Sequence, residues 1–161
     1  MDTEVILKFL YEFAFTLSIF ITGLGWAFFV GRQSLINILI SSYIALVFFS
    51  DFPFNDFLLS ISESPMVNSI LPIILFSVFV LLLHFIIKRL MPLEFLDGKF
   101  ENLGKKLVLA LGVTIFYSGL SFNIVPIHEI LSLDASVQSL FTTGNAFYYS
   151  LIIPLGALAF Q

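Results

Sequence analysis

Two histidines are the side chains of this sequence best suited to acid–base or metal chemistry. His84 precedes Lys88 by one helical turn, and His128 stands beside Glu129. A protein zinc site needs three or four ligands, so His128 and Glu129 alone do not make one. The patterns HExxH, CxxC, GxxxxGK[ST] and GxSxG are all missing from the sequence. We therefore expect no catalytic residue, no metal and no cofactor, and we expect the protein not to be an enzyme.

His84 has two interpretations that the sequence leaves open. An imidazole near the end of an apolar segment is typical of an amphipathic side chain at the membrane surface. A proton relay is the alternative, because histidine titrates near neutral pH. The chain has no cysteine, which excludes disulfides and thiolate chemistry.

The composition predicts an integral membrane protein. Of 161 residues, 59% are hydrophobic and 11% are charged, whereas a soluble domain has roughly 45–50% apolar and about 25% charged residues. So few charges cannot cover a small soluble fold, so the lipid bilayer is the expected partner. The net charge of −4 argues against a nucleic-acid partner. The fold class that follows is all-α: one domain, a polytopic transmembrane helix bundle with four to five spans.

Long apolar stretches define the spans. We predict them at residues 13–31, 34–54, 69–88, 107–125 and 136–160. Residues 34–54 contain several polar side chains, and a spanning helix is favoured there over a re-entrant hairpin. Residues 136–160 form either a kinked fifth span or an interfacial helix followed by a short insertion. The third helix can start at Ser64-Pro65 or at Asn68-Ser69, since both pairs suit a helix N-terminus.

Basic residues indicate the orientation of the chain. Residues 88–106 hold five of the seven Lys and Arg residues, and residues 51–68 and 126–136 hold none. Because cytoplasmic loops are enriched in Lys and Arg, the 89–106 loop is predicted to be cytoplasmic and partly interfacial. The N-terminus is then outside, and the membrane is predicted to be the bacterial inner membrane.

Small residues recur every fourth position on three of the predicted spans. They are Gly23, Ala27 and Gly31, then Asn37, Ser41 and Ala45, then Ala110, Thr114 and Ser118. Small residues let helix backbones approach closely within a bilayer. The rows predict helix packing, either inside one chain or along a seam between copies of a homo-oligomer.

Polar side chains within the spans suggest a second role. Asn37, Thr142, Thr143 and Asn145 are the deepest of them and would line any polar path across the membrane. The alternative is that they hydrogen-bond between helices, at about 0.6 kcal/mol each. Charged residues fall only at span ends or in loops, which argues against an ion-coupled transporter.

Two consecutive segments carry a resemblance to a known family. They read SIFITGLGWAFFVGR, which contains Gly25, Gly31 and Arg32, and SLINILISSYIALVFFSDFPF. Residues 17–54 thereby resemble the CvpA-like (colicin V production) inner-membrane proteins. The resemblance implies a small protein of about four helices connected with envelope homeostasis, and it supplies no catalytic residues.

Composition and resemblance together predict a non-enzymatic structural or scaffold subunit of a bacterial envelope complex. Its expected partners are other membrane protein subunits or further copies of the same chain. The alternative is an oligomeric pore or channel-forming protein of the holin-like kind.

Overall fold

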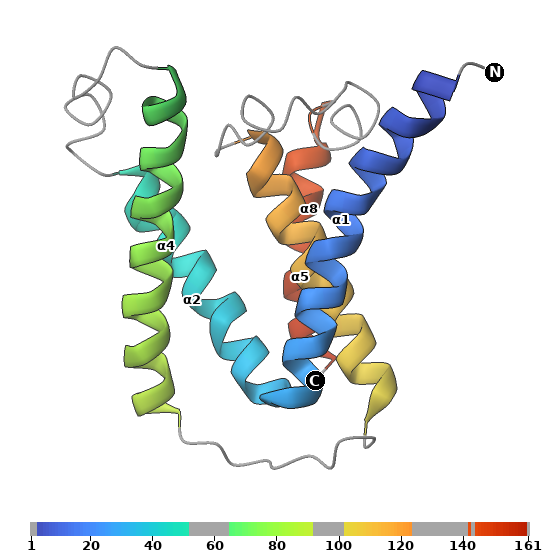
Figure 1. Ribbon diagram of the computed structural model, residues 1–161. Coiled ribbons are helices and arrows are strands. Elements are labelled where there is room, and N and C mark those ends of the chain that lie inside the picture. The colour runs from blue at the N-terminus through green and yellow to red at the C-terminus, as the bar shows by residue number, and fades with distance from the viewer. Residues whose placement is uncertain (1–2, 52–64, 92–101, 124–141, 143, 161) are drawn as a thin grey trace. The chain divides into compact units, whose positions relative to one another are not determined.

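The computed structural model describes residues 3–51, 65–91, 102–123, 142 and 144–160, and its regular structure in these ranges is helical throughout. The helices are α1 (Thr3–Phe29), α2 (Arg32–Ser50), α4 (Pro65–Leu90), α5 (Leu103–Asn123) and α8 (Ala146–Ala159) (Figure 1). The all-α prediction is confirmed. Helix α4 begins with a proline. The fixed φ of proline suits the first turn of a helix, and its missing N–H donor costs no hydrogen bond there.

Three of these helices are long and apolar enough to cross a membrane. They are α2, the Ile70–Leu90 part of α4, and α5. The apolar part of α1, Phe13–Phe29, and the whole of α8 are shorter. A helix of 14 residues such as α8 is about 21 Å long, less than the hydrocarbon core of roughly 30 Å. The three long apolar helices make the protein a helical transmembrane protein, as its composition predicts.

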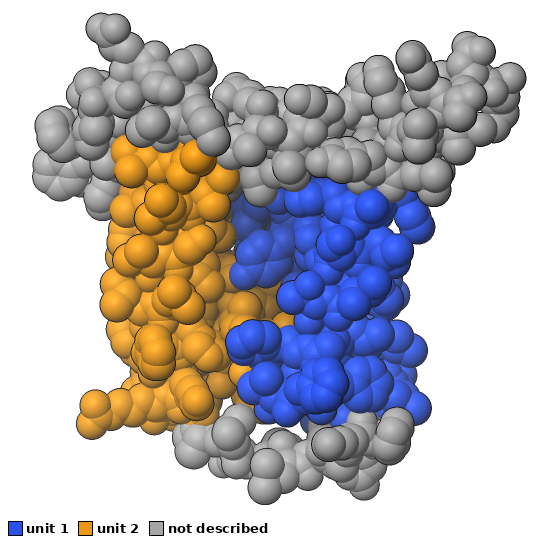
Figure 2. All heavy atoms as spheres, in the orientation of Figure 1, with its two compact units in different colours: residues 1–32, 97–161 blue, residues 33–96 orange. Residues whose placement is uncertain are grey.

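The chain forms two compact units (Figure 2). Unit 1 comprises residues 1–32 and 97–161, and thus α1, α5 and α8. In this unit α1 and α8 both pack against α5, and the three helices run side by side (Figure 1). Helix α5 is therefore the central helix of unit 1.

Unit 2 comprises residues 33–96, and thus nearly all of α2 together with α4. Two aromatic pairs join these helices. The rings of Phe49 and Phe76 lie edge to face at 5.8 Å, and those of Phe48 and Phe79 are 6.4 Å apart. Edge-to-face contact places the positive ring edge on the negative ring face, which stabilises such pairs beyond their buried area.

The observed helix bounds differ from the predicted spans at several ends. Helix α1 begins at Thr3, ahead of the span predicted from residue 13, and α4 begins at Pro65, the earlier of the two predicted starts. Helix α5 begins at Leu103, so the last residues of the predicted 89–106 loop are helical. Residues 92–101 of that loop, and residues 136–141 of the predicted last span, lie outside the described residues.

Candidate functional site

Helix α1 contacts α5 through small residues on one face. A Cβ added at Gly23 would lie 3.6 Å from Val113 Cγ1 and 4.0 Å from the Ala110 backbone. One turn further along α1, Ala27 is completely buried. Near the middle of α1, the rings of Phe15 and Phe122 meet edge to face at 6.1 Å. Residue numbers rise along α1 as they fall along α5, so the two helices are antiparallel.

Helix α8 lies still closer to α5, on a face that the sequence interpretation missed. A Cβ added at Gly119 would be 2.6 Å from Ser150 Cβ, and one added at Gly112 would be 3.0 Å from Ala157 Cβ. Gly112 and Gly119 are seven residues apart on α5, and Ser150 and Ala157 are seven residues apart on α8. This spacing puts the two glycines on one face of α5 and the other two residues on one face of α8. The shared spacing of Gly112–Gly119 and Ser150–Ala157 is the sequence signal that could have found this seam.

The predicted row on α5 is buried along its length. Ala110, Thr114 and Ser118 all have at most a few per cent of their surface exposed. The Thr114 hydroxyl donates to the Ala110 carbonyl at 2.8 Å, within its own helix. The Ser118 hydroxyl is buried and has no hydrogen-bond partner among the described residues. Backbone capture of a hydroxyl allows a polar residue to sit in an apolar interior.

The predicted row on α2 is also buried, and it carries an incompletely bonded amide. Asn37, Ser41 and Ala45 are each 0% exposed. Gln33 Nε2 donates to Asn37 Oδ1 at 3.2 Å, and Ser41 Oγ donates to the Asn37 carbonyl at 2.6 Å. Asn37 Nδ2 makes no hydrogen bond to any described residue. A buried donor without an acceptor lowers the stability of the fold, and a water molecule is one acceptor that could bond to it.

Gly31 serves the end of α1 in the structure. Its φ of +107° belongs to the conformations that glycine adopts most readily, and nothing lies within 4 Å of an added Cβ. The N–H groups of Val30 and Gly31 both donate to the Trp26 carbonyl, at 2.9 and 3.3 Å. This is a glycine helix stop, and it separates Gly31 from the packed positions Gly23 and Ala27.

The residues predicted to line a polar path do not share one environment. Asn37 is buried and belongs to unit 2, whereas Thr142 and Asn145 are exposed and belong to unit 1. Thr143 lies outside the described residues. Asn145 precedes α8 and makes no side-chain capping bond to it. A common path through these residues stays a prediction.

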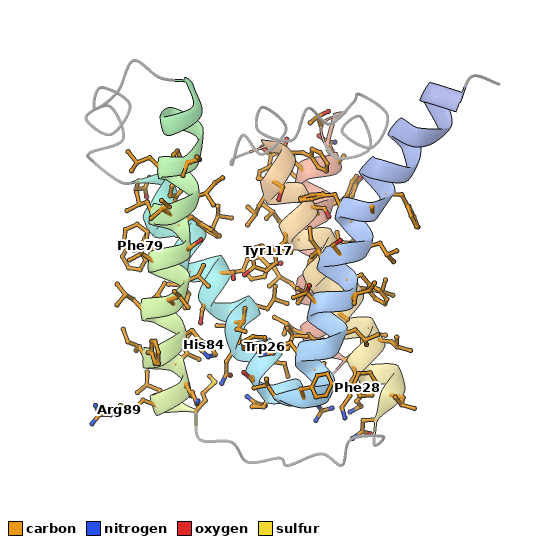
Figure 3. All side chains as sticks on the ribbon, in the orientation of Figure 1. Trp26, Phe28, Phe79, His84, Arg89 and Tyr117 are labelled. Carbon is orange, nitrogen blue, oxygen red and sulfur yellow. The ribbon has the colours of Figure 1, made fainter. Side chains whose placement is uncertain are left out.

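Lys106 is the residue whose placement the sequence interpretation anticipated least. The sequence predicts Lys106 in the 89–106 loop, but it lies in α5 and is only 1% exposed, whereas its neighbour Lys105 is exposed. Its Nζ stands 5.5 Å from the centre of the Phe28 ring, at the end of α1 (Figure 3). A cation over an aromatic face is attracted by the ring quadrupole. This contact joins the end of α1 to the start of α5.

His84 projects from α4 on the side of α2 and is half-buried (Figure 3). Its Nδ1 is buried without a hydrogen-bond partner among the described residues. His128 and Glu129 lie outside the described residues. Within the described part of the chain, no three His, Cys, Asp or Glu side chains gather closely enough to hold a metal ion.

Comparison with known proteins gives no relative. No protein-family model matches the chain, and no curated protein and no solved structure matches it either.

The described residues form a packing site around α5. Helix α1 contacts α5 through Gly23, and α8 contacts it through Gly112 and Gly119. The contact between Lys106 and Phe28 lies at one end of this site.

Proposed function

We propose that the protein is a non-enzymatic scaffold subunit of a bacterial envelope complex. The observation that carries the proposal is the contrast between two spanning helices. In its most apolar stretch 56% of α5 is buried, whereas only 11% of α4 is buried in the corresponding stretch. Helix α5 therefore builds the interior of its unit, and α4 presents its surface to neighbours in the membrane.

The free surface of α4 is continuous and large. The exposed residues include Ile74, Val78, Leu81, Leu82, Phe85 and Ile86. Their spacing of three, four and one residues keeps them on one broad side of the helix. Branched and aromatic side chains of this kind pack against acyl chains or against the apolar side of another membrane helix. A scaffold subunit can use such a surface to hold the helix of a partner protein.

The proposed orientation of the chain in the membrane rests on the basic residues at one end of unit 1. The end of α1 and the start of α5 meet through Phe28 and Lys106, which brings Arg32 and Lys105 to the same end of the unit. By the positive-inside rule we assign this end to the cytoplasm and the start of α1 to the outside. A reporter tag inserted at residue 97 should then be reachable only from the cytoplasm. A tag that is reachable from the periplasm contradicts this orientation.

A second candidate function is an oligomeric pore of the holin-like kind. The buried and unpartnered Asn37 Nδ2 and Ser118 Oγ favour it, because water in a channel could bond to them. Both side chains are completely buried within the chain, which places them away from any lumen enclosed between copies. The scaffold is therefore the better-supported function. The resemblance of residues 17–54 to the CvpA-like proteins stays a prediction.

Site-specific photo-crosslinking in native membranes tests the scaffold. A photoreactive amino acid at Leu81, which is 58% exposed, should give one discrete adduct of higher mass that contains a partner protein. The same amino acid at Phe76 is the matched control, because Phe76 lies on α4 like Leu81 but is buried against Phe49 of α2. It should give adducts within the chain only. Lipid adducts alone at Leu81 and Phe85 would contradict the scaffold.

Liposome leakage separates the two candidate functions. The purified protein, reconstituted at increasing density, should release no trapped dye if it is a scaffold. Dye release that rises steeply with protein density would instead establish the pore.

A further inference from the structure

Two hydroxyl groups of unit 1 are buried without a hydrogen-bond partner among the described residues. They are Thr16 Oγ1 on α1 and Ser118 Oγ on α5. Other hydroxyls are satisfied by the backbone of their own helix: Thr22 Oγ1 donates to the Ser18 carbonyl at 2.7 Å, and Thr114 bonds in the same way. Backbone capture of this kind is the ordinary solution for serine and threonine inside a helix. The hydroxyls of Thr16 and Ser118 therefore need a different partner.

The two hydroxyls lie at the same level of the antiparallel pair formed by α1 and α5. The contacts of Gly23 and of the ring pair Phe15–Phe122 fix the register of this pair. This register places Thr16 within about one helical turn of the position opposite Ser118. Thr16 comes seven residues before Gly23, so both lie on the face of α1 that meets α5. Ser118 comes four residues before Phe122, so these two side chains are neighbours on α5.

The space between α1 and α5 widens from Gly23 toward Thr16. At Gly23 an added Cβ would lie 4.0 Å from the backbone of α5, so the two backbones are close there. At Phe15 and Phe122 the interval is spanned by two aromatic rings whose centres are 6.1 Å apart. The two helices cross and then separate toward the start of α1 (Figure 1). The side chains of Thr16 and Ser118 are much shorter than phenylalanine, which explains why their hydroxyls do not bond to each other.

We propose that Thr16 and Ser118 hold one buried water molecule, which bridges α1 and α5 through hydrogen bonds to both hydroxyls. A hydroxyl both donates and accepts, and water does the same, so a single molecule satisfies both groups. Buried waters in proteins bond to polar groups that otherwise lack a partner, and they are costly to remove. Two neutral hydroxyls are too few for a divalent metal ion, which takes about six or more ligands.

The proposed site is closed along the helix pair. The rings of Phe15 and Phe122 lie on one side of it, and the close contact at Gly23 lies on the other. Ser118 itself is 0% exposed. The water is therefore part of the packing of unit 1, and its exchange requires α1 and α5 to separate. It fastens the part of α1 that has no close backbone contact with α5.

Solid-state NMR of the protein in lipid bilayers detects such a water directly. Magnetisation transferred from water protons should reach the backbone amides of Thr16 and Ser118. Ala110 is the matched control, because it is also completely buried in α5, and its amide should receive none. Absence of transfer to Thr16 and Ser118 contradicts the site. Transfer to Ala110 as well would mean a continuous file of water, and the single closed site would be wrong.

A double-mutant cycle tests the bridge through stability. T16V and S118A each remove one hydroxyl and leave the other without its bridge, so each should destabilise the protein in a sodium dodecyl sulfate titration. The two losses should not add. S118A should raise the unfolding equilibrium constant at least about threefold more in the parent protein than in T16V. Two hydroxyls without a bridge predict the opposite result, in which each apolar replacement is neutral or stabilising and the effects add.

T114V is the matched control for the cycle. The Thr114 hydroxyl is buried, but it bonds within its own helix, so the effects of T114V and T16V should add. Coupling between these two as strong as that between T16V and S118A would show that the cycle reports helix packing, and it would overturn the bridge. None of these measurements involves Leu81 or α4, so the water site and the scaffold can fail separately.

Discussion

The close approach of α8 to α5 at Gly119 gives the sharpest test of the fold. In Gly119→Ala the new Cβ would lie 2.6 Å from Ser150 Cβ, a separation that packed side chains do not adopt. Either α8 must move outward or Ser150 must change its rotamer. The second route breaks the bond of 2.7 Å in which Ser150 Oγ donates to the Phe147 carbonyl, and it does not move Ser150 Cβ. Most of the stability lost in Gly119→Ala is therefore expected to come from the displacement of α8.

The expected magnitude follows from two opposing effects. Overpacking of a close contact costs about 1–3 kcal/mol, and alanine is a better helix former than glycine by about 1 kcal/mol. Gly156→Ala is the matched control, because Gly156 has the same helix-forming gain but meets nothing within 4 Å of an added Cβ. The difference between the two variants isolates the steric cost. At 1–3 kcal/mol this cost is roughly a 5- to 140-fold change in the unfolding equilibrium.

Unfolding by sodium dodecyl sulfate, followed by energy transfer between dyes on α5 and α8, measures this difference. Cysteines at Leu111 and Ile152 can carry the dyes, since both side chains are exposed. The double variant Gly119→Ala with Ser150→Gly should recover most of the lost stability, because it removes both Ser150 atoms nearest the new Cβ. If Gly119→Ala is as stable as Gly156→Ala, α8 does not rest on Gly119 and the reasoning about this seam is refuted.

Three further predictions concern the other buried and exposed positions. Ala27→Leu should destabilise unit 1 by about 1–3 kcal/mol in the same titration, since Ala27 is completely buried, whereas Ala14→Leu at an exposed position of α1 should change stability little. Asn37→Leu should leave stability unchanged or raise it, because it replaces an amide whose Nδ2 is unpartnered with an apolar side chain of similar size; a large loss would show that the amide has a partner. Leu81→Lys should reduce the membrane-inserted fraction of the protein in an alkaline-extraction assay, since lysine in mid-span costs about 3 kcal/mol; in a soluble protein the same exposed substitution would be nearly neutral.

The sequence predicted the helical class and the membrane environment because both depend on average properties of long segments. Helix α4 shows this well, since the high mean hydropathy of Ile70–Leu90 is enough to recognise a span without any knowledge of its neighbours. The ends of helices depend on single residues. Asn102 and Leu103 looked like loop residues next to Lys105 and Lys106, yet α5 already begins at Leu103.

The packing faces were harder to predict for a different reason. Small residues occur on several sides of α5, so their spacing alone cannot show which side meets which helix. The row Ala110, Thr114 and Ser118 is buried, but the closest contacts with α8 are made by Gly112 and Gly119 on another side of the helix. Choosing between these rows requires the position of α8, which the hydropathy of the sequence does not give. The inward turn of Lys106 likewise depends on Phe28, which is distant in sequence.

Burial and hydropathy run in opposite directions among the three spanning helices. Helix α4 is the most apolar and the least buried, α5 is the least apolar and the most buried, and α2 lies between them in both respects. In a water-soluble protein the most apolar helix would be the most buried, because burial there removes apolar surface from water. Within a bilayer the acyl chains already solvate apolar side chains, so helices associate through close backbone approach and shared polar groups instead. The glycines and hydroxyl residues of α5 supply both, which explains why the least apolar span is the one that α1 and α8 enclose.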